Sequence, residues 1–438
     1  MKQKVLYVVH GHPILRPGGA ERYALELYEA MRPSDQFEPI LVARLGTVGY
    51  IDPPRHPGAQ FTVVGGDPNQ YFILTEWDPW DQFLGTYREK TLYTTTIADF
   101  LRTFKPDLVH IQHTHFVGYD LLTLIRRMRP QVPIVYTLHE FLPICHRDGQ
   151  MVRSIGESLC THSSPRRCNE CFPEWSAQHF FLRERLIKSH LSHVDQFLAP
   201  SRQLLERFVD WGIPREKIRY EEYGRIAQPR FEAPVEARPR TRLAFFGQIS
   251  RFKGLEVLLQ AMKIVAELAP EAHLMVYGAN LEVLPEPQRK VYEDALAEAG
   301  ANVTFAGGYS PSSLPRLMAD IDWVVVPSRW WENSPLVIQE AFMHGRPVIC
   351  SGVGGMAEKV TDGVNGLHFI MSNRPHLAET IARAVQTPGL WEQLCKGIPP
   401  VYGMAEHTAH LHTLYTDLIA QRAGPVEETV PLEEVEAG

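Results

Sequence analysis

One stretch of the sequence, Val324 to Cys350, constrains the fold more than any other part of the chain. Apolar residues at its start predict a buried strand, and the following loop closes at Ser334-Pro335, a pair suited to the beginning of a helix. Apolar residues then recur at helical spacing. We expect the helix to end at Gly345, because glycine readily takes the left-handed conformation in which helices end. A second apolar run begins at Pro347. The stretch therefore predicts one strand–helix–strand unit of a parallel sheet, with the helix starting at Pro335.

Two glutamates of this stretch are candidates for one ligand pocket. Glu332 lies in the loop beyond the carboxyl end of the strand, where open parallel sheets bind ligands, and Glu340 lies in the helix, leaning toward its N-terminus. A carboxylate is costly to bury unless it meets hydrogen-bond donors, and sugar or ribose hydroxyls are donors. The alternative is a solvated Glu340 on the helix surface. Its apolar neighbours Leu336, Val337 and Met343 weaken that alternative.

The stretch resembles the signature of the nucleotide-sugar-dependent retaining glycosyltransferases of family 4, PS-x-x-E-x-x-P-x-x-x-x-E-A-x-x-x-G-x-P-V. The sequence matches this skeleton, with one residue extra, at Pro327, Ser328, Glu332, Pro335, Glu340, Ala341, Gly345, Pro347 and Val348. The resemblance implies that Glu332 touches the donor sugar near the reacting carbon and that Glu340 binds the ribose hydroxyls. It also implies that the residues around the helix start, Asn333, Ser334, Pro335 and Leu336, bind the donor.

Composition bounds the class of protein. A length of 438 residues predicts two or three domains, and a net charge of −7 lacks the basic excess of a nucleic-acid-binding protein. The N-terminal apolar run, Val5 to Val9, is shorter than a signal-peptide core, and no apolar run approaches the length of a membrane span. We therefore expect a cytoplasmic protein, with peripheral contact at the inner membrane face as an open alternative.

The N-terminal part reads as strand, glycine loop and helix. Lys4 to Val9 predicts a buried strand, and Ala20 to Met31 predicts an amphipathic helix. Between them, Gly18 and Gly19 would let the backbone approach an anion at the helix N-terminus, although a simple turn is an alternative. The family resemblance implies a GG-x-E motif that faces the donor phosphates, and Gly18, Gly19 and Glu21 fit it.

Further strands and helices alternate as in a doubly wound sheet. Strands are expected at Pro39 to Leu45, Asp107 to Gln112 and Ile134 to Leu138, with a helix at Val117 to Met128. Gly49 to Lys105 lacks a long periodicity but is rich in aromatic side chains; these are candidates for stacking on sugars, and a small core of their own is the preferred interpretation.

A Pro- and Arg-rich segment, Ala227 to Arg242, predicts a linker, and a second sheet begins at Leu243. Helices are expected after it at Leu255 to Leu268 and at Arg374 to Gln386. The resemblance implies the GT-B architecture, an α/β fold of two doubly wound Rossmann-like domains facing each other across a cleft. We expect an acceptor-side domain over 1–230 and a nucleotide-sugar-binding domain over 240–402. A final helix over 403–422 would cross back to the first domain, and 424–438 would form a disordered acidic tail.

Several further residues become site candidates through the resemblance. His139 directly follows a strand, where the family has a histidine that contacts the donor sugar, although a structural role is the commoner one for such a residue. The family loop G-R-x-x-x-x-K-G neutralises the diphosphate; Lys253 matches its lysine, Gln248 replaces its arginine, and Arg251 is the candidate substitute cation. The resemblance also places the nucleotide base near Tyr309.

Four cysteines, Cys145, Cys160, Cys168 and Cys171, lie in a short insert spanning 145–171. In a reducing cytosol such clustering favours structural zinc, with free thiols, a disulfide or an iron–sulfur cluster as alternatives. The helix expected at Glu174 to Leu191 is basic and apolar, which suits a membrane surface; a helix packed on the sheet is the favoured alternative.

The combined prediction is a metal-independent, hexosyltransferase-type enzyme. It would move a sugar from a nucleotide-diphosphate sugar to a sugar or lipid-linked hydroxyl acceptor with retention, in glycan, glycolipid or glycoconjugate biosynthesis, with His139, Glu332 and Lys253 as catalytic residues. A nucleotide-sugar 2-epimerase on the same fold and a non-catalytic donor-binding subunit are the alternatives.

Overall fold

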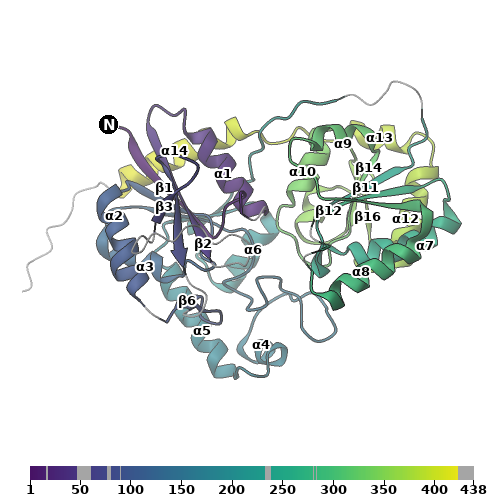
Figure 1. Ribbon diagram of the computed structural model, residues 1–438. Coiled ribbons are helices and arrows are strands. Elements are labelled where there is room, and N and C mark those ends of the chain that lie inside the picture. Colours follow the sequence, from purple (N-terminus) through teal and green to yellow (C-terminus); the bar gives the residue numbers. More distant parts are fainter. Residues whose placement is uncertain are drawn as a thin grey trace, which may run out of the picture. The chain divides into compact units, whose positions relative to one another are not determined.

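Strands and helices alternate along the chain and build two large sheets (Figure 1). The computed structural model describes residues 1–15, 18–46, 61–75, 80–88, 90–231, 238–279, 281–282 and 284–422. The chain divides into two compact units, one formed by Met1–Thr137, Arg185–Phe197 and Thr408–Gly438 and the other by Leu138–Glu184 and Leu198–His407. The predicted linker lies partly outside the described residues, and the predicted tail lies wholly outside them.

The first sheet has the strand order β10-β9-β8-β7-β1-β2-β4-β3. Its centre is β1, whose five residues Val5 to Val9 are all buried and which pairs in parallel with β2 and β7. At the other edge, β3 runs antiparallel to its neighbour, β4. The strands are β1 (Gln3–Val9), β2 (Phe37–Gly46), β3 (Phe61–Val63), β4 (Gln70–Thr75), β7 (Leu108–Ile111), β8 (Ile134–Thr137), β9 (Gln196–Ala199) and β10 (Ile218–Tyr220).

The helices of the first unit include one that sequence periodicity did not indicate. The described part of the stretch expected to be irregular contains α2 (Ala98–Phe104), the π-helix η1 (Leu92–Ile97) and the short hairpin of β5 (Trp80–Asp81) and β6 (Thr86–Tyr87). Its aromatic residues Trp80, Phe83, Tyr87 and Tyr93 are buried, which confirms their interpretation as core. The remaining helices are α1 (Gly19–Met31) and α3 (Asp120–Met128), together with most of α14 (Met404–Arg422).

The second sheet is parallel throughout, with the order β13-β12-β11-β14-β15-β16. Successive residues of β11 enter different cores: Leu243 and Phe245 pack into one cluster, and Ala244 and Phe246 into the other. Helices therefore cover both faces, with α7, α8 and α12 on one and α9 and α10 on the other (Figure 1). The strands are β11 (Arg242–Gln248), β12 (His273–Ala279), β13 (Val303–Gly307), β14 (Trp323–Val326), β15 (Val348–Ser351) and β16 (Gly366–Phe369).

The helices around this sheet match the sequence prediction where many apolar residues recur at helical spacing. Two of them have the predicted bounds, α7 (Leu255–Leu268) and α12 (Arg374–Gln386). Four were not predicted as helices: α8 (Glu286–Ala299), α9 (Leu314–Asp320), α11 (Gly354–Lys359) and α13 (Leu390–Lys396). In α8 the buried side chains are Tyr292 and two alanines, so its apolar signal is weak. The short 3-10 segments are η3 (Arg251–Lys253) and η4 (Gly300–Asn302).

Helix α10 (Leu336–Met343) corrects one local prediction. Pro335 is its N-cap rather than its first residue, and no side chain caps the helix. The hydroxyl of Ser334 instead donates to Glu222 Oε1 at 2.7 Å. The predicted end is confirmed, because Gly345 takes a φ of 68° directly beyond the helix.

The segment between β8 and β10 carries further helices. The cysteine insert, expected to be a loop, contains α4 (Pro165–Cys171), and the basic helix is α5 (Ala177–Leu191), followed by α6 (Arg202–Trp211) and the 3-10 segment η2 (Arg215–Lys217). Arg183 of α5 is buried rather than solvated, since it donates to the carbonyls of Leu142 and Pro143. Within the described residues, no helix is long and apolar enough to cross a membrane.

Candidate functional site

The loop between β14 and α10 holds a carboxylate in a strained position. Glu332 is 4% exposed and has a φ of 35°, a left-handed conformation that non-glycine residues rarely adopt. Such strain costs of order 1–3 kcal/mol and persists only where surrounding contacts hold it. Ser328 Oγ donates to Glu332 Oε1 at 2.7 Å, and Lys253 Nζ donates to the same oxygen at 2.7 Å. The structure thus joins two residues that the sequence suggested separately as catalytic.

A pair of glycines supports this loop from the start of α11. The Gly355 N–H lies 3.0 Å from the Trp331 carbonyl and 2.9 Å from that of Glu332, and so donates to the loop rather than to a ligand. A Cβ at Gly354 would overlap the Trp331 carbonyl, and one at Gly355 would overlap that of Asn333. Glycine at both positions therefore lets α11 pack directly against the loop that carries Glu332.

Asn333 connects this loop to the residues that follow β8. Its side-chain N–H group donates to the carbonyls of Leu138 at 3.2 Å and His139 at 3.3 Å, while its oxygen accepts from Ser201 Oγ at 2.6 Å. Asn333 and Ser201 are both buried, so these bonds are shielded from water. The geometry makes Asn333 a fixed link between the Glu332 loop and His139.

The imidazole of His139 is oriented by a tyrosine that sequence reasoning missed. The Tyr223 hydroxyl lies 2.6 Å from His139 Nδ1, and the two rings stack at 5.3 Å with an interplanar angle of 18°. Burial raises the pKa of Tyr223 well above its ordinary value, so its hydroxyl stays protonated. Both the hydrogen bond and the stacking restrict the orientation of the imidazole ring.

Glu340 of α10 already has a charged partner. Its Oε1 lies 3.1 Å from Arg225 Nη2, and the two side chains are 4% and 1% exposed. Burial of Glu340 confirms that it is not the solvated surface residue of the alternative interpretation. The resemblance implied ribose hydroxyls as its partner, whereas no sequence pattern indicated Arg225. A role toward ribose would have to be shared with this ion pair.

The two basic residues of the glycine loop after β11, Arg251 and Lys253, have different partners. Gln248 ends the strand and is half-buried, whereas the Arg251 side chain is 59% exposed and forms an ion pair with Glu157 of the cysteine insert. Arg329 pairs with the same carboxylate at 3.0 Å. Lys253 is therefore the cation of this loop that the structure brings to Glu332, and the role of Arg251 toward phosphate stays a prediction.

The remaining donor-site candidates are divided between the two units. Tyr309 packs its ring edge against Phe246, at a centroid distance of 5.4 Å, and Leu336 at the start of α10 is half-buried. In the first unit, Gly18 is the N-cap of α1 and Gly19 is its first residue.

A buried acid lies beneath Gly18. Glu21 is 7% exposed and forms an ion pair with His10 at 3.0 Å. A Cβ on Gly18 would overlap this carboxylate, so the glycine makes room for Glu21. Burial alone would raise the pKa of Glu21, but the hydrogen bond and charge of His10, with a contribution from His113, lower it to about 2.

The four cysteines of the insert are free and line one small cavity. Burial raises the pKa of Cys145 to about 11 and also raises that of Cys168. Across the described part of the chain, no group of three or more His, Cys, Asp or Glu residues is placed to hold a metal ion. The structure therefore gives no support to the predicted zinc site, and zinc stays a prediction.

Two family models match consecutive parts of the chain. "Glycosyl transferase 4-like domain" covers residues 18–224, and "Glycosyl transferases group 1" covers residues 230–397. In overall fold the chain is similar to sucrose-phosphate synthase from Thermosynechococcus elongatus, with a TM-score of 0.70 and 19% identity over 96% of this chain and 100% of that one. It is also similar to HepE from Anabaena, solved in complex with UDP-glucose, with a TM-score of 0.61 and 17% identity over 96% and 98% of the two chains. These findings establish the fold as GT-B and support a GT-B glycosyltransferase.

Sequence relatives point the same way. A lipopolysaccharide 1,2-N-acetylglucosaminetransferase from Salmonella typhimurium is 32% identical over 186 residues, which are 40% of this chain and 48% of that protein. The alignment thus spans about half of that relative's length. A D-inositol 3-phosphate glycosyltransferase from Rhodococcus jostii is 25% identical over 409 residues, covering 89% of this chain and 83% of that protein.

Proposed function

We propose that this protein transfers a hexosyl group from a nucleoside-diphosphate sugar to a hydroxyl acceptor, with retention of configuration and without a catalytic metal. The observation that carries the proposal is the buried, strained Glu332 held by Lys253 at the carboxyl edge of the second sheet. The two glycosyltransferase domains support it, as does the UDP-glucose bound to the similar HepE.

The contacts suit the charges that develop in such a reaction. When the bond between sugar and diphosphate breaks, negative charge grows on the leaving group and positive charge on the anomeric carbon. Lys253 and the N–H groups at the start of α10, which no side chain caps, would stabilise the leaving diphosphate. Glu332 would face the positively charged sugar, and its present bond to Lys253 would be shared with the donor when the donor binds.

His139 would contribute a hydrogen bond to the sugar. Donation by the Tyr223 hydroxyl to His139 Nδ1 would fix the imidazole proton on Nε2. An N–H at that position can donate to a sugar hydroxyl. Tyr223 would then act as a positioning residue, through the tautomer of the histidine.

The acceptor is proposed to be a sugar or lipid-linked hydroxyl, in glycan, glycolipid or glycoconjugate biosynthesis. Helix α5 supports peripheral contact with a membrane surface, since Phe181 and Leu182 are 50% and 60% exposed and Arg185 is exposed beside them. Retention and the acceptor class rest on the family resemblance, whereas a cytoplasmic location rests on the short apolar runs of the sequence.

The test is a thermal-shift panel of nucleotide sugars, followed by transfer assays with the donor that stabilises the protein most. The expected result is transfer in the presence of EDTA, with the anomeric configuration of the product, read by proton NMR, equal to that of the donor. Conversion of the donor without any acceptor would favour the 2-epimerase. Donor binding with neither transfer nor conversion, across a wide acceptor panel, would favour a non-catalytic subunit.

A further inference from the structure

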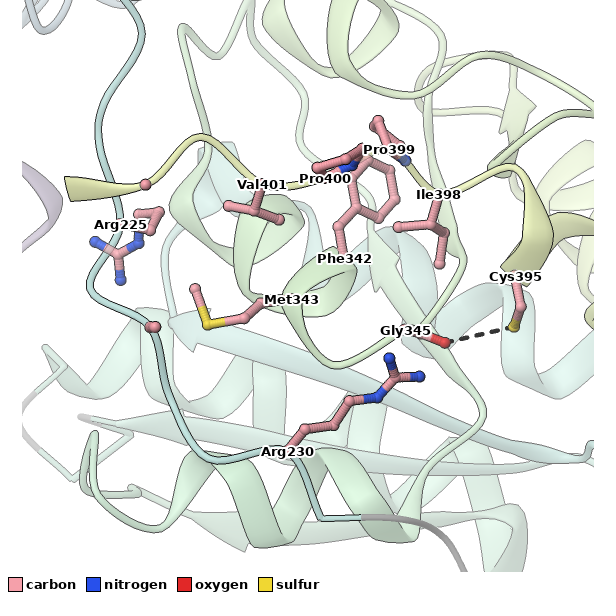
Figure 2. Close-up of a pocket in the computed structure, with 12 residues that line it drawn as sticks. Arg225, Arg230, Phe342, Met343, Gly345, Cys395, Ile398, Pro399, Pro400 and Val401 are labelled. Carbon is pink, nitrogen blue, oxygen red and sulfur yellow. Dashed lines mark hydrogen bonds between the residues drawn. The ribbon is translucent and has the colours of Figure 1, made fainter. Parts of the chain in front are cut away.

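A cavity of about 470 Å³ in the second unit lies against the C-terminal half of α10 (Figure 2). Two connecting segments and the end of α13 complete its wall. It shares no lining residue with the contacts of Glu332, Lys253 or His139. The residues that line it are Arg225, Ala227, Arg230, Phe342, Met343, Gly345, Cys395, Ile398, Pro399, Pro400, Val401 and Gly403.

One part of the wall is apolar and rigid. Phe342 and Met343 come from α10, and Ile398 and Val401 come from a segment that also contributes two consecutive prolines (Figure 2). Prolines have fixed backbone angles, so this side of the cavity is preformed. Such a surface suits a ring or a short hydrocarbon chain, because ligand sites are mostly apolar with a few polar groups that fix orientation.

Two arginines are the charged residues of the wall, and Arg225 is already paired with Glu340. Arg225 and Arg230 line the cavity, and the described lining residues include no aspartate or glutamate. The Arg230 guanidinium lies against Gly345, where any Cβ would overlap it (Figure 2). Among the residues that the structure describes, no carboxylate lies within ion-pair distance of Arg230. Its charge is therefore available to a ligand.

Two titratable residues beside the cavity, His344 and Cys395, stay neutral. Besides burial, the charges of Arg346 and Arg230 lower the pKa of His344, so this histidine stays neutral rather than acting as a further cation. Burial raises the pKa of Cys395 to about 12, and its thiol donates to the Gly345 carbonyl at 3.4 Å. The cysteine thus brings no negative charge into the cavity.

We propose that this cavity is a second ligand site, which binds a small organic phosphate with an apolar body. The phosphate would lie at Arg230, because a guanidinium matches the geometry of phosphate oxygens with paired hydrogen bonds. The apolar body would pack on Phe342 and Met343. The Arg230 guanidinium, with no aspartate or glutamate among the described lining residues, favours an anionic ligand over a neutral one.

Calorimetric titration with three probes tests both halves of the proposal. Phenyl phosphate has both the phosphate group and the apolar ring. Inorganic phosphate has only the phosphate group, and phenol has only the ring. Phenyl phosphate is expected to bind at least about tenfold more tightly than either fragment, since it alone uses both walls. Equal affinity for phenyl phosphate and inorganic phosphate, or no heat at millimolar phenyl phosphate, would overturn the proposal.

Variants then locate the binding. Arg230→Ala removes an exposed side chain and is expected to fold, while weakening phenyl phosphate about tenfold or more. Met343→Trp fills the cavity and is expected to block binding. Arg374→Ala, a similarly exposed arginine on α12, is the matched control and should bind as the unmodified protein does.

A fourth variant separates this cavity from the donor site, which would also attract phosphate. Lys253→Ala should leave phenyl phosphate binding unchanged, and UDP should not compete with it. Unaltered binding in Arg230→Ala, or binding that disappears in Lys253→Ala, would place the probe in the donor site and refute the second site.

Discussion

Lys253 Nζ lies 2.7 Å from Glu332 Oε1, although 79 residues separate the two in the chain. The carboxylate is buried, whereas the lysine side chain is 36% exposed. The pair is therefore open to a ligand from the lysine side. Since Lys253 comes from the loop after β11 and Glu332 from the loop after β14, neighbouring parallel strands bring them together.

The first prediction concerns this pair. Lys253→Ala should lower the transfer rate about 10²- to 10³-fold, because it removes a preorganised charge from the departing diphosphate. Its effect on the free energy of unfolding should stay near or below about 1 kcal/mol, since the side chain is partly solvated. The measurements are kcat with the best donor and urea denaturation. Lys263→Ala breaks an exposed lysine–glutamate pair of similar length elsewhere and should change neither quantity appreciably.

The second prediction tests the orientation of His139 by Tyr223. Tyr223→Phe keeps the stacked ring but removes the hydrogen bond to Nδ1. The imidazole should then titrate and change tautomer more freely, so kcat should fall about tenfold and its dependence on pH near neutrality should shift. KM for the donor should change little. An unchanged pH profile together with an unchanged kcat would show that the hydrogen bond is only structural.

Sequence reasoning found the elements that carry strong local signals. The segment from Pro327 to Gly345, a loop followed by α10, could be recognised because its turn residues, apolar spacing and two glutamates lie within one short stretch. By contrast, Tyr223 and Arg225 follow a short edge strand and have no periodic pattern around them. Their partners, His139 and Glu340, are 84 and 115 residues away, so only the folded chain shows that they matter.

The same reason explains why the partner of Arg251 was not predicted. Arg251 matched the need for a second positive charge near the diphosphate, but Glu157 of the insert pairs with it. No local pattern around Glu157 indicates this contact. Helix α8 was missed for a different reason, because its buried face is mostly alanine, which barely raises the apolar periodicity.

The third prediction follows from the lowered pKa of Glu21. Its folded-state pKa of about 2 lies below the ordinary value of 4.5, so between these values the unfolded chain binds more protons. The stabilising contribution is therefore complete above about pH 4.5 and is lost as the pH falls toward 2. Glu21→Gln should flatten the pH dependence of the unfolding free energy in this window, as measured by urea denaturation. Parallel curves for the two proteins would contradict the assignment.

The fourth prediction concerns the binding of zinc by the cysteine insert. The spacing of the four thiols predicts one bound zinc, although their arrangement in the structure does not support it. Elemental analysis of protein purified without added metal decides between them: about one equivalent would confirm zinc, and less than about half an equivalent with four titratable thiols would refute it. If zinc is present, Cys168→Ser should release it, whereas Cys350→Ser, at a buried cysteine of β15, should not.

The fifth prediction separates two roles of Glu340. Arg225→Ala leaves the buried carboxylate without its cation and should destabilise the protein by about 3–5 kcal/mol. Glu340→Gln removes the charge but keeps a polar group, and if Glu340 also binds ribose it should weaken a nucleoside diphosphate by about 1–3 kcal/mol. A 2′,3′-dideoxy nucleotide lacks the hydroxyls and should bind the unmodified protein and Glu340→Gln with the same affinity. If Glu340→Gln weakens both nucleotides equally, or neither, then Glu340 serves the ion pair with Arg225 and not the ribose.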